Sequence, residues 1–167
     1  MNNVVLIGFM GTGKSTVGKK IAERLGFSYI DTDEVIEKTE KKKISEIFNE
    51  YGEKYFRDLE TEVIKTLQDY DHFIIATGGG MVLRDENVKM LKALGPLVLL
   101  YTNPDVIFER IKSVQNRPLI EEDKLDKIKE ILKQRDPIYS KVADFKVDTS
   151  LLAIDEVVDI ILKELKK

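Results

Sequence analysis

The sequence predicts an α/β fold in which a parallel β-sheet is flanked by α-helices. Short apolar runs alternate with longer segments whose apolar residues recur every three or four positions, which is typical of successive βαβ units. A glycine-rich segment, residues 8–16, directly follows the first apolar run and precedes a helical pattern, as a strand-to-helix turn of such a unit would. The length of 167 residues and the 43% hydrophobic content suit one domain over residues 1–167.

The predicted elements follow one another without an internal repeat or a low-complexity linker. Apolar runs predict strands at residues 4–7, 27–30, 73–76, 97–101 and 144–147. Helical periodicity predicts amphipathic helices at residues 17–25, 56–67, 125–135 and 154–165. Another helix is expected from Asn103 and Pro104, because Asn caps a helix N-terminus and Pro fits the first turn. The region of about residues 113–124 lacks periodicity and predicts a mobile loop of the kind that forms lids.

Composition excludes several classes of function. The 27 basic and 30 acidic side chains leave a net charge of -3, so no basic footprint for nucleic acid is expected. With no Cys and one His, the chain cannot build a Cys-based zinc site or use a thiolate nucleophile. The first apolar run is too short for a signal peptide or a membrane span, so we expect a cytoplasmic protein with no membrane contact. The helices show no obvious apolar patch, so a monomer is the default expectation.

Residues 8–16, GFMGTGKST, match the phosphate-binding loop pattern of Gly, four residues, then Gly-Lys-Ser/Thr. Glycines let backbone N–H groups converge on phosphate oxygens, and the following helix N-terminus adds partial positive charge. Lys14 is expected to reach the β- and γ-phosphates, and Ser15 to give Mg²⁺ a hydroxyl ligand. An ordinary glycine-rich turn is disfavoured, since chance gives this match in about one such chain in 200. The residues expected to bind the nucleotide phosphates are Gly11, Thr12, Gly13, Lys14, Ser15 and Thr16.

A pair of carboxylates follows the second predicted strand, in the sequence Asp31-Thr32-Asp33. The carboxyl edge of the sheet is where open α/β folds bind ligands. With alternating side chains, Asp31 and Asp33 can point the same way, one holding Mg²⁺ through water and the other accepting a hydrogen bond from a substrate hydroxyl. The alternative is that Asp33 only caps a helix that begins at Glu34.

Three further features suggest a second binding site. The run Thr77-Gly78-Gly79-Gly80 would expose backbone N–H groups after the third strand, unless it is only a flexible turn. Arg57 lies on a predicted helix, where it could instead form a surface pair with Glu53 or Glu60. Arg135 continues an apolar stripe, and an arginine on such a face usually has an anionic partner.

The ordered motifs GFMGTGKST, DTD, FRDLE, TGGG, NRPL and RDPIY resemble shikimate kinase across almost the whole chain. The resemblance implies a three-layer P-loop fold of the nucleoside-monophosphate-kinase style, with a five-stranded parallel sheet of order 2-3-1-4-5 and a mobile lid. It also implies that ATP, with Mg²⁺, phosphorylates the 3-hydroxyl of shikimate. That reaction is a step of the route to chorismate and the aromatic amino acids.

The resemblance also implies roles for individual residues. It assigns about residues 32–60 to a shikimate-binding region, and the residues that would bind shikimate are Asp33, Arg57, Gly79 and Arg135. The two arginines would hold the carboxylate, while Asp33 and the Gly79 N–H would form hydrogen bonds with the hydroxyls. Arg110 matches a position that stacks on adenine, whereas residues 149–153 carry no family signature. Arg117 of the lid would close over the nucleotide phosphates and stabilise charge in the transition state together with Lys14 and Mg²⁺. The expected catalytic residues are thus Lys14, Asp33 and Arg117, and the expected metal ligands are Ser15 and Asp31.

Two alternatives remain open from the sequence. A related kinase, such as gluconate kinase or a nucleoside-monophosphate kinase, would share the loop and the lid but not the set formed by Asp-Thr-Asp, Arg57, the triple glycine and Arg135. A nucleotide-binding regulatory module that transfers nothing is a different class of protein. Such a switch has no need of a second anion-binding cleft, so the intact set argues against it.

Overall fold

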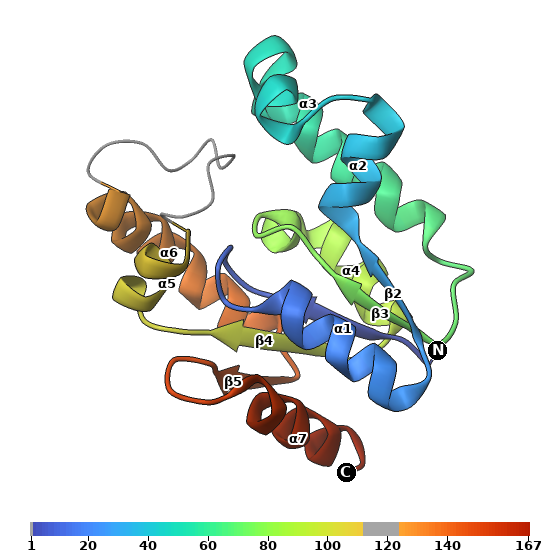
Figure 1. Cartoon of the computed structure of the whole chain (residues 1–167). Helices are drawn as coiled ribbons and strands as arrows, with labels where there is room; N and C mark the ends of the chain where they lie inside the picture. The colour runs from blue at the N-terminus through green and yellow to red at the C-terminus, as the bar shows by residue number, and fades with distance from the viewer. Residues whose placement is uncertain (1, 112–123) are drawn as a thin grey trace.

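Five parallel strands form the centre of the structure, a computed structural model that describes residues 2–111 and 124–167 (Figure 1). The strands lie in the order β2-β3-β1-β4-β5, which confirms the predicted topology within the described residues. All neighbouring strands pair in parallel. The strands are β1 (Val4–Ile7), β2 (Ser28–Asp31), β3 (Phe73–Ala76), β4 (Leu97–Tyr101) and β5 (Phe145–Asp148), so β2 and β5 each lie one residue later than predicted.

Helices cover both faces of the sheet. In chain order they are α1 (Lys14–Leu25), α2 (Thr32–Glu40), α3 (Ile44–Thr66), the 3-10 turn η1 (Met81–Leu83), α4 (Asp85–Leu94), α5 (Pro104–Ile111), α6 (Lys124–Val142) and α7 (Ile154–Leu165). No helix among the described residues is long and apolar enough to cross a membrane. In Figure 1, α1 crosses in front of the sheet, while α2 and the start of α3 extend away from it at the top.

The alternation of side chains along β1 divides the apolar interior into two cores. Val4 and Leu6 pack with α1 and α7 on one face of the sheet. Val5 and Ile7 belong to the larger core on the other face, with α3, α4, α5 and α6. Because successive side chains of a strand point to opposite faces, a strand buried on both sides must be apolar throughout. The uninterrupted Val-Val-Leu-Ile run is therefore what this central position requires.

The observed helices differ from the predicted ones at several points. The cap at Asn103 is confirmed, since its Oδ1 accepts a hydrogen bond of 3.0 Å from the Val106 N–H. Helix α4 was not among the predicted helices, although Val88, Leu91 and Leu94 carry its spacing. Helix α6 continues through Pro137 rather than ending at residue 135. The predicted lid and Arg117 lie outside the described residues, apart from residue 124, which begins α6.

Candidate active site

The glycine-rich loop between β1 and α1 is held in place by its own polar groups. Gly13, the residue before α1, has a φ of 101°, a left-handed conformation that side chains disfavour. Thr12 is buried, and its hydroxyl donates a hydrogen bond of 2.8 Å to the Phe9 carbonyl. The Lys14 ammonium donates to the carbonyls of Gly8 and Phe9. The loop is therefore fixed as a rigid turn at the start of a helix, as phosphate binding requires.

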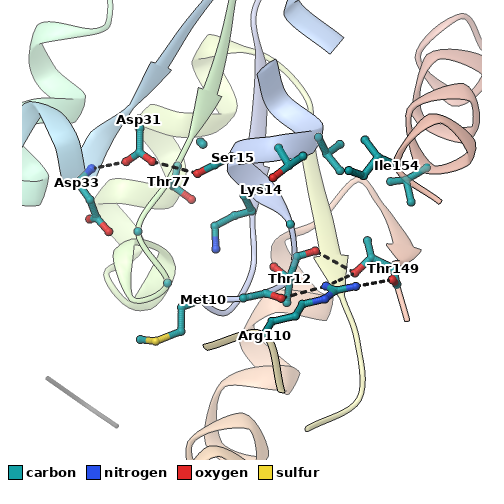
Figure 2. Close-up of a pocket in the computed structure, with 18 of the residues that line it drawn as sticks. Met10, Thr12, Lys14, Ser15, Asp31, Asp33, Thr77, Arg110, Thr149 and Ile154 are labelled. Carbon is teal, nitrogen blue, oxygen red and sulfur yellow. Dashed lines mark hydrogen bonds between the residues drawn. The ribbon is translucent and has the colours of Figure 1, made fainter. Parts of the chain in front are cut away.

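A pocket of about 420 Å³ opens above this loop (Figure 2). Residues 11–16 line it, so all the residues predicted to bind the nucleotide phosphates lie together. Beyond them, Arg110 of α5 donates hydrogen bonds to the carbonyls of Gly11, at 3.0 Å, and Thr149, at 2.9 Å. The Thr149 hydroxyl donates in turn to the Thr12 carbonyl at 2.9 Å. This end of the pocket thus joins the phosphate loop to the segment after β5.

Sequence reasoning missed the apolar side of the same pocket. Leu152, Ile154 and Val157 line it together with Arg110 and Thr149. These residues carry no motif, and only the position of the segment after the last strand brings them there. An apolar wall beside an arginine suits the flat faces of an aromatic base.

Asp31 and Asp33 both reach the pocket, but not by the predicted strand alternation. Strand β2 ends at Asp31 and α2 begins at Thr32, so Asp33 is already helical. Asp31 is the cap of α2, because its Oδ1 accepts hydrogen bonds from the N–H groups of Asp33 (2.9 Å) and Glu34 (3.3 Å). The alternative in which Asp33 caps a helix beginning at Glu34 is therefore wrong. Its carboxylate instead points into the site (Figure 2).

The oxygens around Ser15 and Asp31 suit a magnesium ion bound mainly by phosphate and water. The Ser15 hydroxyl lies 3.5 Å from Oδ2 of Asp31, the carboxylate oxygen that does not cap α2. In the described part of the chain, no group of three or more His, Cys, Asp and Glu side chains could hold a metal by itself. Mg²⁺ commonly takes one or two protein oxygens together with waters and substrate phosphates. The residues present therefore fit the predicted ion.

A second pocket, of about 360 Å³, adjoins the first. The residues that line both pockets are Met10, Ser15, Asp31, Asp33, Gly78 and Gly79. Phe48 and Phe56 of α3 give the second pocket an apolar wall, and Arg57 and Arg135 line it as well. The two compartments thus meet at Ser15 and Asp33, between the phosphate loop and a pair of arginines.

Arg57 pairs with both of the glutamates predicted for it. Its Nη1 donates to Oε1 of Glu60 at 2.7 Å, and its Nη2 lies 3.3 Å from Oε2 of Glu53. Only 11% of the Arg57 side chain is exposed, however, and it lines the second pocket. The surface-pair alternative therefore identified the partners correctly but not the location of the arginine.

Glu60 is the most unusual ionisable group of the site, and it was not predicted as a site residue. It is 0% exposed, and within the described residues its Oε2 has no hydrogen-bond partner. Burial raises the pKa of Glu60 to about 7, although the charge of Arg57 opposes this rise. The nearby charge of Asp33 adds to it. Its helical spacing from Arg57 was visible in the sequence, but burial was not.

Arg135 lies on α6 with 9% of its surface exposed and lines the second pocket. Its guanidinium carbon is 5.9 Å from the centre of the Phe9 ring. No carboxylate of the described residues forms an ion pair with it. A buried arginine of this kind suits an anion bound in the pocket that it lines.

The triple glycine lines the second pocket, and hydrogen bonds hold its backbone in place. The Gly78 N–H donates to the Thr32 hydroxyl, and the carbonyls of the three glycines accept from the Met81 N–H, the Tyr139 hydroxyl and the Leu83 N–H, in that order. Among the described residues, the N–H groups of Gly79 and Gly80 have no such partner. Since these glycines line the pocket, their N–H groups complement the arginines as donors to an anion.

Comparison with known proteins shows which family has this sequence and fold. A family model described as shikimate kinase matches residues 10–166. The chain belongs to the shikimate kinase family. A shikimate kinase from Thermodesulfovibrio yellowstonii is 52% identical over 168 residues, which cover 100% of this chain and 96% of that protein. The structure of a shikimate kinase from Acinetobacter baumannii in complex with shikimate is similar with a TM-score of 0.95 and 36% identity, covering 99% of this chain and 93% of that one.

More distant structures share only the fold. A gluconokinase from Sinorhizobium meliloti has a TM-score of 0.58 at 17% identity, covering 99% of this chain and 91% of that chain. Membership of the shikimate kinase family establishes ATP as the co-substrate class of this chain. It also agrees with the geometry, since every predicted site residue that the structure describes lines one of the two adjoining pockets.

Proposed function

We propose that this chain transfers the γ-phosphoryl group of ATP to the 3-hydroxyl of shikimate, giving shikimate 3-phosphate and ADP. The observation that carries this proposal is the junction of the two pockets at Ser15, Asp33 and Gly79. A phosphate loop on one side and two arginines on the other suit a nucleotide facing a small carboxylic acid. The product would serve the route to chorismate and the aromatic amino acids.

The nucleotide lies in the first pocket in this proposal. Backbone N–H groups of residues 11–16 surround its phosphates, and Lys14 leaves its two loop carbonyls to reach them. Adenine stacks on Arg110, whose guanidinium is already anchored at Gly11 and Thr149. The apolar side chains beyond Thr149 cover its other face.

Ser15 and Asp31 would hold Mg²⁺ beside the bound nucleotide. Ser15 would contribute its hydroxyl, and Asp31 would act through Oδ2, the oxygen that does not cap α2. The ion would neutralise charge on the phosphate oxygens during transfer. Asp31 thus serves both the start of α2 and the metal with separate oxygens.

Shikimate lies in the second pocket, with its carboxylate toward Arg57 and Arg135 and its ring against Phe48 and Phe56. Arginines suit this task because their planar donors match a carboxylate. The pre-existing pairs of Arg57 with Glu60 and Glu53 fix its guanidinium before the substrate arrives. Less ordering is then required on binding.

Asp33 acts on the reacting hydroxyl. Its position where the pockets meet allows it to accept the hydroxyl's hydrogen bond and to orient the oxygen toward the γ-phosphorus in line with the leaving group. Lys14 stabilises charge on the transferred group. No phosphorylated enzyme intermediate is needed. The predicted role of Arg117 in closing over the phosphates stays a prediction, since that residue is outside the described part of the chain.

The remaining expectations about partners also belong to this proposal. The net charge of -3 supports the absence of a nucleic-acid partner. A monomeric, cytoplasmic enzyme without membrane contact stays a prediction from the sequence.

An acceptor panel tests the proposed reaction. ADP release from Mg-ATP is measured with shikimate, gluconate, a set of nucleoside monophosphates and no acceptor. We expect stimulation by shikimate alone, with one phosphorylated product formed per ADP. Stimulation by another acceptor would replace the substrate assignment, and equal slow release in every case would favour a regulatory nucleotide-binding module.

A further inference from the structure

Tyr139 is a buried side chain beside Gly79 and Arg135, two residues that line the second pocket, and the proposed reaction does not use it directly. It lies on α6 one helical turn after Arg135, and 2% of its surface is exposed. Its hydroxyl donates a hydrogen bond of 2.5 Å to the carbonyl of Gly79. This bond joins α6 to the triple glycine, which are 60 residues apart in the chain.

The same hydroxyl lies beside Arg135. A methyl group placed on Gly79 would find the Arg135 Nη1 at 3.3 Å and the Tyr139 hydroxyl at 3.6 Å, so both side chains approach this glycine from one side. Burial raises the pKa of the Tyr139 hydroxyl, while the charge of Arg135 and a hydrogen bond with it oppose the rise. The hydroxyl therefore keeps its proton near neutral pH and can continue to donate it to the carbonyl.

The bond to the Gly79 carbonyl fixes more than one atom. A peptide unit is planar and trans, so the carbonyl of Gly79 and the N–H of Gly80 point in opposite directions. With the carbonyl held toward α6, the Gly80 N–H is held in the opposite direction. The Arg57 guanidinium also lies against Gly80, since a methyl group placed on that glycine would overlap it. Glycines have wide freedom in φ and ψ, so this peptide would not keep one orientation without an anchor.

We propose that Tyr139 is a positioning residue that aligns the Gly80 N–H and the Arg135 guanidinium on the shikimate carboxylate. This inference rests on the proposed function and extends it by one residue that touches neither substrate. It predicts that the hydroxyl of Tyr139 matters for shikimate and not for ATP. The hydrogen bonds of the Arg110 guanidinium to Gly11 and Thr149 in the nucleotide pocket do not involve it.

Tyr139→Phe tests the inference, because it keeps the buried ring and removes only the hydroxyl. Tyr70→Phe is the matched control, since Tyr70 lies before β3 at the opposite end of the strand from the glycines. Steady-state kinetics on the purified full chain should show the KM for shikimate raised about tenfold in Tyr139→Phe, with the KM for ATP within about twofold of the parent value. Tyr70→Phe should change neither constant.

The methyl ester of shikimate separates positioning at the carboxylate from a general effect. In the parent chain the ester should be a poorer substrate than the acid. The Tyr139→Phe substitution should then lower kcat/KM for the ester by a much smaller factor than kcat/KM for the acid. The reason is that esterification and the substitution remove the same interaction.

Three results would refute the positioning role, and a fourth would refute the proposed function. An unchanged KM for shikimate in Tyr139→Phe would refute the positioning role, and so would equal rises in the KM for shikimate and for ATP, which would indicate a general structural effect. Equal losses for the acid and the ester would place the role away from the carboxylate and refute it too. A parent chain that does not phosphorylate shikimate at all would refute the proposed function, and this inference with it.

Discussion

The buried carboxyl of Glu60 makes a quantitative prediction about stability and pH. The pKa of this group is 4.5 in an unperturbed chain and about 7 in the folded protein, chiefly because of burial. The folded state therefore keeps a proton that the unfolded state has lost. Between these two pKa values unfolding releases a proton, so the contribution of Glu60 to the free energy of unfolding falls as pH rises. Below the lower value both states are protonated, and above the upper value both are ionised.

The magnitude follows from the same two pKa values. A tenfold change in protonation equilibrium is worth about 1.4 kcal/mol, so the full effect is roughly 3 kcal/mol. Between about pH 5 and about pH 8 the change amounts to about 2.5 kcal/mol, because the unfolded state is already partly ionised at the lower pH. Such a loss is a large part of the stability of a small domain.

Glu60→Gln isolates this contribution. Glutamine keeps the shape of the side chain and an oxygen for the Arg57 hydrogen bond, but it does not titrate. The free energy of unfolding in urea is measured for both proteins across this pH range. We expect the variant to gain stability relative to the parent by about 2.5 kcal/mol as pH rises from about 5 to about 8.

Other titrating groups cancel in the difference between the two proteins. If the free energies of unfolding of the two proteins changed in parallel with pH, Glu60 would have the same pKa in the folded and unfolded states. A parent that gains stability relative to Glu60→Gln as pH rises would show that the ion pair with Arg57 outweighs burial. Either result would refute the reasoning.

Three substitutions separate the two pockets. Asp33→Asn should lower kcat by at least about 100-fold with the KM for ATP nearly unchanged; a normal kcat would remove Asp33 from the reaction. Gly80→Ala should raise the KM for shikimate by about 10-fold or more, because the added methyl group would overlap the Arg57 guanidinium, and an unchanged KM would show that Arg57 does not bind the substrate. Thr149→Val should raise the KM for ATP by about fivefold and leave the KM for shikimate unchanged, because it removes the hydroxyl that bonds to the Thr12 carbonyl and to the Arg110 guanidinium. The reverse pattern would contradict the assignment of the pockets.

Much of the fold could be predicted because its signals are local. An apolar run such as Val4–Ile7 predicts a buried strand wherever it occurs. The loop from Gly8 to Lys14 has a fixed relation to the strand before it and the helix after it. The Asn103-Pro104 pair likewise predicts a helix start from neighbouring residues alone, and the structure confirms it.

The parts that could not be predicted depend on contacts between distant segments. Whether Glu60 is a surface partner of Arg57 or a buried acid depends on what covers α3, which no local pattern encodes. Tyr139 reaches the Gly79 carbonyl because α6 continues through Pro137, although a proline usually ends or kinks a helix. The roles of Asp31 and Asp33 depend on a one-residue shift of the strand end, which is the least certain feature of any sequence-based prediction.

The most direct test of the account is the identity of the product. Purified protein is incubated with Mg-ATP and shikimate, and the product is examined by mass spectrometry and by phosphorus–proton NMR correlation. The account predicts one added phosphoryl group, coupled to the proton on the carbon that bears the 3-hydroxyl, in equal amount to the ADP formed. Phosphate on another hydroxyl would contradict the proposed geometry at Asp33, and ADP with free phosphate but no phosphorylated shikimate would contradict the proposed reaction.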